Sequence, residues 1–193
     1  GECNWLINGV QHTAKVVLSL EPEASAAGVN VTNALDHGLP NEMLSVVLEE
    51  LEVAGQGGGV LGFPLMRIKA RLLSGEMHET DSTEIAFRSA ASHAFDQALR
   101  EAGTVLLEPI MRLEISTPEE YVGDLVSDLQ QRRAIIHQTQ QRGSQTVLHA
   151  DAPLSELFGY SSAMRSLSQG RASCSMEPSG FSPAPEEELK RFL

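Results

Sequence analysis

The side chains best suited to contact another molecule stand close together in the run GEMHETDS, residues 75–82. The run contains His78, Glu79, Asp81 and Ser82, and the patterns on either side predict a polar turn between a strand and a helix. An imidazole in such a turn can donate to the phosphate or 2′-hydroxyl groups of RNA. On the residues alone, an ordinary exposed histidine is the favoured interpretation.

A glycine-rich run, GQGGG at residues 55–59, has the composition of a phosphate-binding loop. Such a loop follows a strand and opens a helix, so that its amides and the helix dipole meet the anion. Here the run follows a helical pattern and precedes an extended one. We therefore expect a connection at this place and no nucleotide site.

Metal and nucleophile chemistry are not predicted either. Five further histidines have neither cysteine partners nor HExxH spacing: His12, His37, His93, His137 and His149. Cys3 and Cys174 are far apart and outside any CxxC pair, which favours a reducing compartment and, for Cys174, a buried thiol. No GxSxG run is present. We expect no catalytic, cofactor-binding or metal site in this chain.

The distribution of charge limits the classes of partner. Arg67, Lys69 and Arg71 alternate along one extended run, and they fit either a face that follows a phosphate backbone or a solvated face. The net charge of −12 argues against holding nucleic acid by general phosphate attraction. Any RNA contact must therefore be local and driven by shape.

Length and composition predict a soluble globular protein. The 193 residues fit one large domain or two small ones, and no apolar run approaches the roughly 18 residues of a membrane span. The chain begins with Gly1 and not with Met, so we expect it to be a piece of something longer.

The first half alternates extended and helical patterns. Residues 15–21 and 65–73 are predicted strands, the second half-exposed by its alternation. One helix is predicted from Asn41 to Gly55, and another from a capping box of Asp81 and Glu84 to Gly103. Their predicted buried stripes are Leu44, Val47, Leu48 and Leu51, and Phe87, Ala91, Ala94, Phe95 and Ala98.

The second half predicts a compact βαββαβ unit of the ferredoxin-like type. Its predicted strands are residues 108–116, 134–139, 146–153 and 171–177, with Gly143 in the turn between the second and third. Thr117, Pro118 and Glu120 predict a capped helix start, and a further helix is predicted over residues 154–168. The first strand should bury Met111, Leu113 and Ile115, the first helix Val122, Leu125, Val126 and Leu129, and the last strand Ala172, Cys174 and Met176. The tail predicts a short surface helix.

Several long motifs, in order, resemble domains IV and V of translation elongation factor G. They are HETDSTEIAF at residues 78–87, LLEPIM at 106–111, TPEEYVGDLVSDLQQRR at 117–133 and PLSELFGYSSAMRSLSQGRAS at 153–173. The resemblance covers residues 15–176, nearly the whole chain.

This resemblance implies an α+β fold of two domains. Residues 1–107 would be an N-terminally truncated domain IV, an elongated left-handed βαβ arm of the ribosomal-protein-like type. Residues 108–193 would be a ferredoxin-like domain V with a C-terminal tail.

The resemblance also implies a function and partners. In the family the arm enters the decoding region of the small ribosomal subunit and displaces tRNA during translocation, and domain V touches large-subunit rRNA near the sarcin-ricin loop and the stalk base. GTP and magnesium belong to the family's first domain, so we expect neither in this chain and a GTPase in its parent. We expect a monomer in the bacterial cytoplasm, with the mitochondrial matrix as the alternative.

Residue by residue, His78 matches the family's tip-loop histidine, and Glu79, Asp81 and Ser82 continue that loop. The other tip loop departs from the family, because NGVQHTAK at residues 8–15 stands where GGxGQYGH is usual and keeps only Gly9. In the second domain the resemblance makes some arginines rRNA contacts, without saying which, and others are expected to form surface ion pairs: Arg132, Arg133, Arg142, Arg165 and Arg171.

Two alternatives stay open. The altered loop motivates a parent that recycles ribosomes or protects them from an antibiotic. A different class, the ATP-dependent small-molecule kinases, uses the same left-handed βαβ fold, although the position of the glycine run speaks against it.

Overall fold

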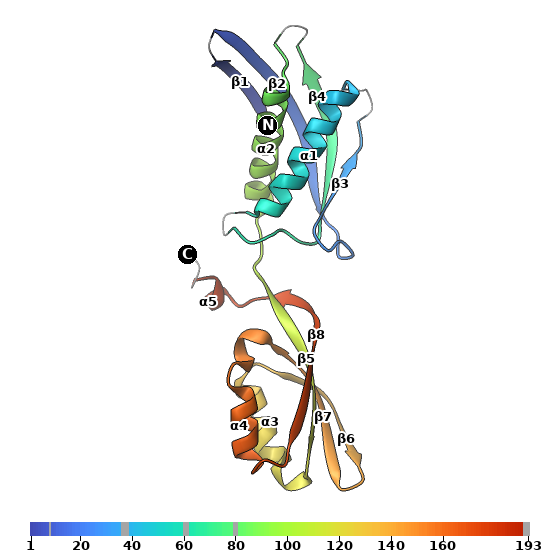
Figure 1. Ribbon diagram of the computed structural model, residues 1–193, viewed down its shortest axis with the longest axis vertical. Helices are drawn as coiled ribbons and strands as arrows, with labels where there is room; N and C mark the ends of the chain where they lie inside the picture. Colours follow the sequence, from blue (N-terminus) through green and yellow to red (C-terminus); the bar gives the residue numbers. More distant parts are fainter. Residues whose placement is uncertain (8, 36–38, 60–61, 79–80, 191–193) are drawn as a thin grey trace. The chain divides into compact units, whose positions relative to one another are not determined.

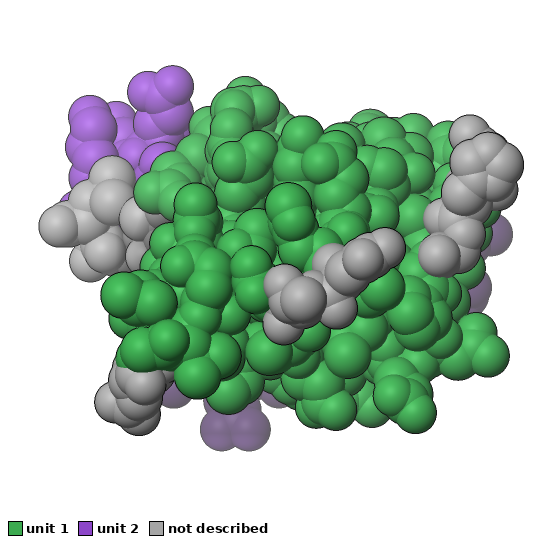
Figure 2. Space-filling model, turned by 90° about the horizontal axis from the view of Figure 1, so that it is seen from above, with its two compact units in different colours: residues 1–104 green, residues 105–193 purple. Residues whose placement is uncertain are grey.

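The computed structural model describes residues 1–7, 9–35, 39–59, 62–78 and 81–190. They form two compact units, residues 1–104 (unit 1) and 105–193 (unit 2), shown in different colours in Figure 2. The sequence predicted a division between residues 107 and 108. Among the described residues, no helix is both long and apolar enough to cross a membrane.

Unit 1 is a four-stranded sheet with two helices on one face (Figure 1). Its elements are β1 (Glu2–Ile7), β2 (Val10–Pro22), β3 (Val29–Asn33), α1 (Asn41–Gly57), β4 (Ile68–Met77) and α2 (Glu84–Ala102). The strand order is β1-β2-β4-β3, in which β2 is antiparallel to β1 and β4. β3 and β4 are parallel and α1 connects them, by the rare left-handed crossover that the resemblance implied (Figure 1).

Small residues let both helices lie close to this sheet. Ala90, Ala91 and Ala94 of α2 are buried against it, and Gly55 of α1 lies so close to Val29 of β3 that a Cβ there would overlap the valine. The large side chains of this core are Phe87, Phe95, Leu51, Leu72, Val16 and Val47. The buried face of α2 ends at Leu99 and not at the predicted Ala98. Helix α1 continues to Gly57, so the predicted end at Gly55 is wrong.

The predicted starts of β4 and α2 are wrong. β4 begins at Ile68 and not at residue 65, because Arg67 adopts a left-handed backbone with φ of 59°. α2 is capped by Thr83 and not by Asp81: Thr83 Oγ1 accepts from the Ala86 amide at 3.3 Å. The carbonyl of Asp81 accepts from Thr13 of β2, so Asp81 belongs to the loop before the helix. Gly103 ends α2, as predicted, with φ of 73°.

Unit 2 has the ferredoxin-like order β6-β7-β5-β8, with every pair antiparallel. Its elements are β5 (Leu107–Thr117), the 3₁₀ helix η1 (Glu119–Tyr121), α3 (Val122–Gln131), β6 (Ile135–Arg142), β7 (Gln145–Pro153), the 3₁₀ helix η2 (Leu154–Leu157), α4 (Tyr160–Leu167), β8 (Ser173–Pro183) and α5 (Glu186–Leu189). α3 and α4 cover one face of this sheet (Figure 1). The predicted βαββαβ unit is confirmed, including Gly143 in the β6–β7 turn with φ of 63°.

The core of unit 2 follows the predicted faces in part. Leu113, Ile115, Leu125 and Leu129 are fully buried, whereas Met176 on β8 is exposed. Thr117 does not cap a helix, because it is the last residue of β5 and is itself fully buried. The predicted helix over residues 154–168 is interrupted, since Phe158 is extended and Gly159 has φ of 74°.

Candidate functional site

Two connections lie at one end of unit 1, which we call the tip end (Figure 1). One is the β1–β2 turn, where Gly9 has φ of 82°. The other is the β4–α2 loop, of which His78 and residues 81–83 are described. The register explains the shared position, because Met77 at the end of β4 lies opposite Ala14 of β2. The predicted loop residue Glu79, like His37, lies outside the described residues.

Both backbone groups of one residue of β2, Thr13, bind the β4–α2 loop. The amide of Thr13 donates to the carbonyl of Asp81 at 2.8 Å, and the hydroxyl of Ser82 donates to the carbonyl of Thr13 at 2.8 Å. The same hydroxyl accepts from the amide of His78 at 2.8 Å. His78 itself is exposed at the surface. The described part of the loop is therefore hydrogen-bonded to β2, while the imidazole of His78 is accessible.

A second attachment, between two side chains, was not foreseen. Nδ1 of His12, on β2, lies 2.8 Å from Oγ1 of Thr83, the cap of α2. This contact joins the loop's last residue to β2, next to Thr13. The sequence separation of 71 residues gives no local signal for the pair. The cap itself could have been found, because Thr83 directly precedes the helical run.

The β1–β2 hairpin carries exposed apolar side chains and extends beyond the end of β4. Trp5 is 43% exposed, Leu6 70% and Val10 54%. The Trp5 ring meets His93 of α2 edge to face, with 6.0 Å between centroids. Gly9, the one family match in this turn, lies at the far end of the hairpin, before Val10.

In unit 2, Arg132 and Arg133 are built into the fold. Arg132 donates to Asp128 at 2.8 Å and to the Glu156 carbonyl at 2.7 Å, and it lies 5.3 Å from the centroid of the buried Tyr160 ring. Burial raises the pKa of Tyr160 above its ordinary value. Arg133 is paired with Glu108 and Glu156, and its hydrogen bond to Glu108 raises its pKa. These contacts occupy both guanidinium groups within unit 2.

The other predicted arginines lie at the surface. Arg171 is paired with Glu120 at 3.1 Å with both side chains exposed, and Arg142 lies 3.7 Å from Glu114. Arg165, on the last turn of α4, is exposed. In unit 1, Arg71 is paired with Glu21 at 3.5 Å, which neutralises part of the strand face that also carries Lys69.

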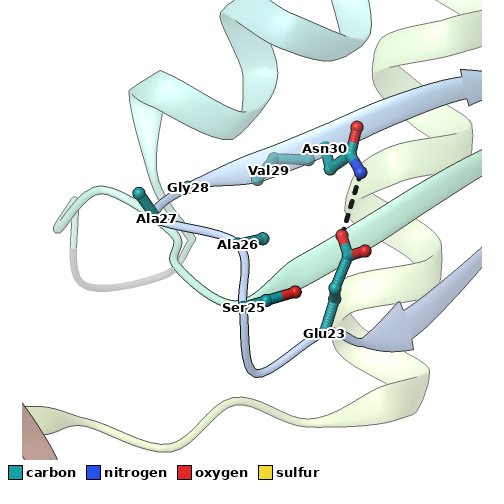
Figure 3. Close-up of a pocket in the computed structure, with 7 residues that line it drawn as sticks. All are labelled: Glu23, Ser25, Ala26, Ala27, Gly28, Val29 and Asn30. Atoms are coloured by element: carbon teal, nitrogen blue, oxygen red, sulfur yellow. Dashed lines mark hydrogen bonds between the residues drawn. The ribbon is translucent and has the colours of Figure 1, made fainter.

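A shallow pocket lies in the β2–β3 connection (Figure 3). It is lined by Glu23 and residues 25–30. The Glu23 carboxylate already accepts from the Asn30 side-chain amide at 3.0 Å. Its remaining lining is small side chains and backbone, so we assign it no ligand. Within the described ranges, no three His, Cys, Asp or Glu side chains lie close enough together to hold a metal ion.

Two family models match the chain, and together they span nearly all of it. Elongation factor G, domain IV matches residues 7–103, and Elongation factor G C-terminus matches residues 105–192. The two matches meet where the structure divides the chain, between Thr104 and Val105.

Relatives and a solved structure agree with these matches. Elongation factor G of Thermotoga maritima is 42% identical over 181 residues, which are 92% of this chain and 26% of that relative. The Fervidobacterium nodosum factor is 44% identical over 155 residues, 80% of this chain and 22% of the relative. A crystal structure of a Thermus thermophilus protein matches with a TM-score of 0.85 and 35% identity, over 100% of this chain and 29% of that one.

The chain thus spans about a quarter of the length of the relatives that it matches. The residues matched by each family model fall within one unit of the structure. The fold is similar to that of a solved structure over the whole chain. This chain belongs to the elongation factor G family, of which it carries domain IV and the C-terminal domain.

Proposed function

We propose that this chain is the C-terminal ribosome-interacting module of an elongation-factor-G-like translational GTPase. In the proposal, the tip end of unit 1 enters the decoding region of the small subunit and promotes the movement of tRNA and mRNA. Unit 2 contacts large-subunit rRNA near the sarcin-ricin loop and the stalk base. GTP and magnesium act in another domain of the parent, in the bacterial cytoplasm.

The observation that carries the proposal is the exposed His78, whose amide donates to the Ser82 hydroxyl, which in turn donates to β2. A side chain whose backbone is already held by hydrogen bonds loses less conformational entropy when it enters an RNA site, so more of the contact energy remains as affinity. The net charge of −12 works against general phosphate binding, and specificity must then come from a few positioned donors. Such a donor is what the imidazole of His78 provides.

An exposed arginine of unit 2 supports the proposed contact of this unit with large-subunit rRNA. Arg132 and Arg133 are occupied by carboxylates and carbonyls of their own unit, whereas Arg165 is exposed at the end of α4. Among the family-assigned arginines, Arg165 therefore fits an rRNA phosphate contact best. The charge-reversing variant Arg165→Glu should weaken binding more than the neutral Arg165→Gln.

Binding to purified bacterial ribosomes tests the proposal directly. The 193-residue chain is sedimented with 70S ribosomes, alongside His78→Ala and a matched control, His137→Ala, which alters an exposed histidine in unit 2. Loss of one charged or polar RNA contact should weaken binding of His78→Ala about tenfold. His137→Ala should bind like the unaltered chain. Failure of the unaltered chain to sediment with ribosomes would refute the proposal.

One observation favours a second candidate, a parent that recycles or protects ribosomes. The β1–β2 hairpin exposes Val10 within residues 8–15, where the family's glycine-rich loop is usual, and exposes Trp5 and Leu6 on the preceding strand. A translocating parent should restore growth to a bacterial strain depleted of its own elongation factor G. A recycling or protection factor should not.

A further inference from the structure

We propose that Ser82 is a positioning residue for His78 and does not itself contact the bound partner. The inference rests on the proposed function, because it concerns how the β4–α2 loop presents its imidazole. It differs from the assignment that the resemblance implied, in which Ser82 is one of the contacting residues of the loop.

The hydroxyl of Ser82 is the hydrogen-bonding centre of this loop. It accepts from the amide of His78 at 2.8 Å and donates its only proton to the carbonyl of Thr13 at 2.8 Å. Because one oxygen accepts the first hydrogen bond and donates the second, it links the start of the loop to β2. Ser82 is half-buried, and its proton is not available to an outside acceptor.

Both backbone groups of Thr13 form hydrogen bonds with the loop. Its amide donates to Asp81 and its carbonyl accepts from Ser82. Beyond the last β2–β4 pair, Ala14 with Met77, the loop thus continues to bind the edge of β2 without being a strand. The contact of His12 with Thr83 adds a third attachment. Among the described residues of the loop, 81–83 are half-buried and attached to β2, and His78 is exposed to solvent.

Without the Ser82 hydroxyl, the amide of His78 loses its acceptor. The backbone at His78 is then held only by the end of β4, and its imidazole samples more orientations. Because ordering it again costs free energy on binding, we expect weaker binding with no contact removed from the partner. Threonine keeps the hydroxyl and should keep the function.

A double-mutant cycle on ribosome binding tests the proposal. Ser82→Ala should weaken binding roughly fivefold, the size of one ordinary hydrogen bond, and Ser82→Thr should restore it. In a His78→Ala background, Ser82→Ala should have no further effect. Ser45→Ala is the matched control, because the Ser45 hydroxyl shares its proton between two carbonyls of its own helix, those of Asn41 and Glu42.

Amide hydrogen exchange of the free chain supplies a readout that does not need ribosomes. The His78 amide should exchange faster in Ser82→Ala, while amides of the α2 core keep their protection. An unchanged His78 exchange rate would overturn the proposal, as would an equal loss of binding from Ser82→Ala with and without His78. If the unaltered chain bound no ribosomes, the proposed function would fail, and the exchange data would still decide whether Ser82 fixes the loop.

Discussion

Arg133 and Glu108 form a two-pronged ion pair, with Nη1 2.8 Å from Oε1 and Nη2 2.9 Å from Oε2. Glu108 stands at the start of β5, and its side chain is only 12% exposed. The Nε of Arg133 also donates to Glu156 of η2 at 2.9 Å. The backbone of Arg133 has φ of 57°, a left-handed conformation that costs energy for a residue with a side chain. Three segments of unit 2 thus meet at one guanidinium.

Arg133→Ala should destabilise unit 2. Removal of the guanidinium leaves the mostly buried Glu108 carboxylate without its partner, and we expect a loss of about 2 kcal/mol in the free energy of unfolding. Denaturant unfolding followed by the fluorescence or circular dichroism of unit 2 measures it. Arg133→Lys should recover only part of the loss, since an ammonium cannot make the paired contact.

The matched control for this change is Arg171→Ala. Arg171 is also paired with a glutamate, Glu120, but the side chains are 62% and 60% exposed. An ion pair in that setting is screened by water, and its loss should change the free energy of unfolding by less than about 0.5 kcal/mol. Equal effects of the two substitutions would mean that the Arg133 cluster is no stronger than a surface pair.

The order and type of the main elements could be predicted because they depend on local patterns. Alternating apolar residues located all four strands of the unit 2 sheet but only β2 and β4 of the unit 1 sheet, so β1 and β3 were missed. Apolar residues spaced three to four apart located the main helices, and Gly143 correctly indicated the turn between β6 and β7. The boundaries failed where tertiary contacts decide them. Asp81 has the chemistry of a cap, but its carbonyl is engaged by β2 and Thr83 caps α2 instead.

The candidate site was predictable only in its outline. His78 was found by its motif, yet the residues that hold its loop, Thr13 and His12, stand on another strand far away in the sequence. The same limit applies to Arg132 and Arg133, which the resemblance made candidate rRNA contacts. Their partners Glu108 and Glu156 become visible only after β5 and η2 are brought beside the end of α3.

Thr117→Val should stabilise unit 2. The Thr117 hydroxyl is buried at the end of β5 and has no hydrogen-bond partner among the described residues. Valine has the same shape and favours strands, so removing the unpaired group should raise the free energy of unfolding by about 1 kcal/mol. Thr139→Val, at an exposed position of β6, should change it little. Destabilisation by Thr117→Val would reveal a partner for the hydroxyl.

Cys174 should be a slow nucleophile at neutral pH. Burial raises the pKa of its thiol to about 11, and the thiolate is the reactive form. At pH 8 only about one thiol in a thousand is ionised, so alkylation at this residue should be slow and should accelerate about tenfold per pH unit. Peptide mapping by mass spectrometry separates Cys174 from the buried Cys3. Rapid labelling of Cys174 in the folded chain at pH 8 would contradict this.

The same shift gives a pH dependence of stability. The folded state holds the Cys174 proton more tightly than the unfolded chain, whose thiol has its ordinary pKa of 9.0. The stabilisation of the folded state that comes from this protonated thiol is therefore complete below pH 9 and is lost as the pH rises toward about 11. Cys174→Ala should make the free energy of unfolding less sensitive to pH in this window, and an unchanged slope would show that other groups cause the fall.

Gly55→Ala should destabilise unit 1, although alanine is the better helix former. A Cβ at Gly55 would lie 2.7 Å from Cγ2 and 2.9 Å from Cβ of Val29, both within the packed interface of α1 and β3. Moving the helix outward should cost about 1–3 kcal/mol in the free energy of unfolding, more than the helix propensity of alanine returns. Gly57→Ala, at the end of the same helix, has nothing within 4 Å of its new Cβ and should be neutral or slightly stabilising. Thermal unfolding of the two variants separates close packing from propensity, because propensity alone would make both more stable.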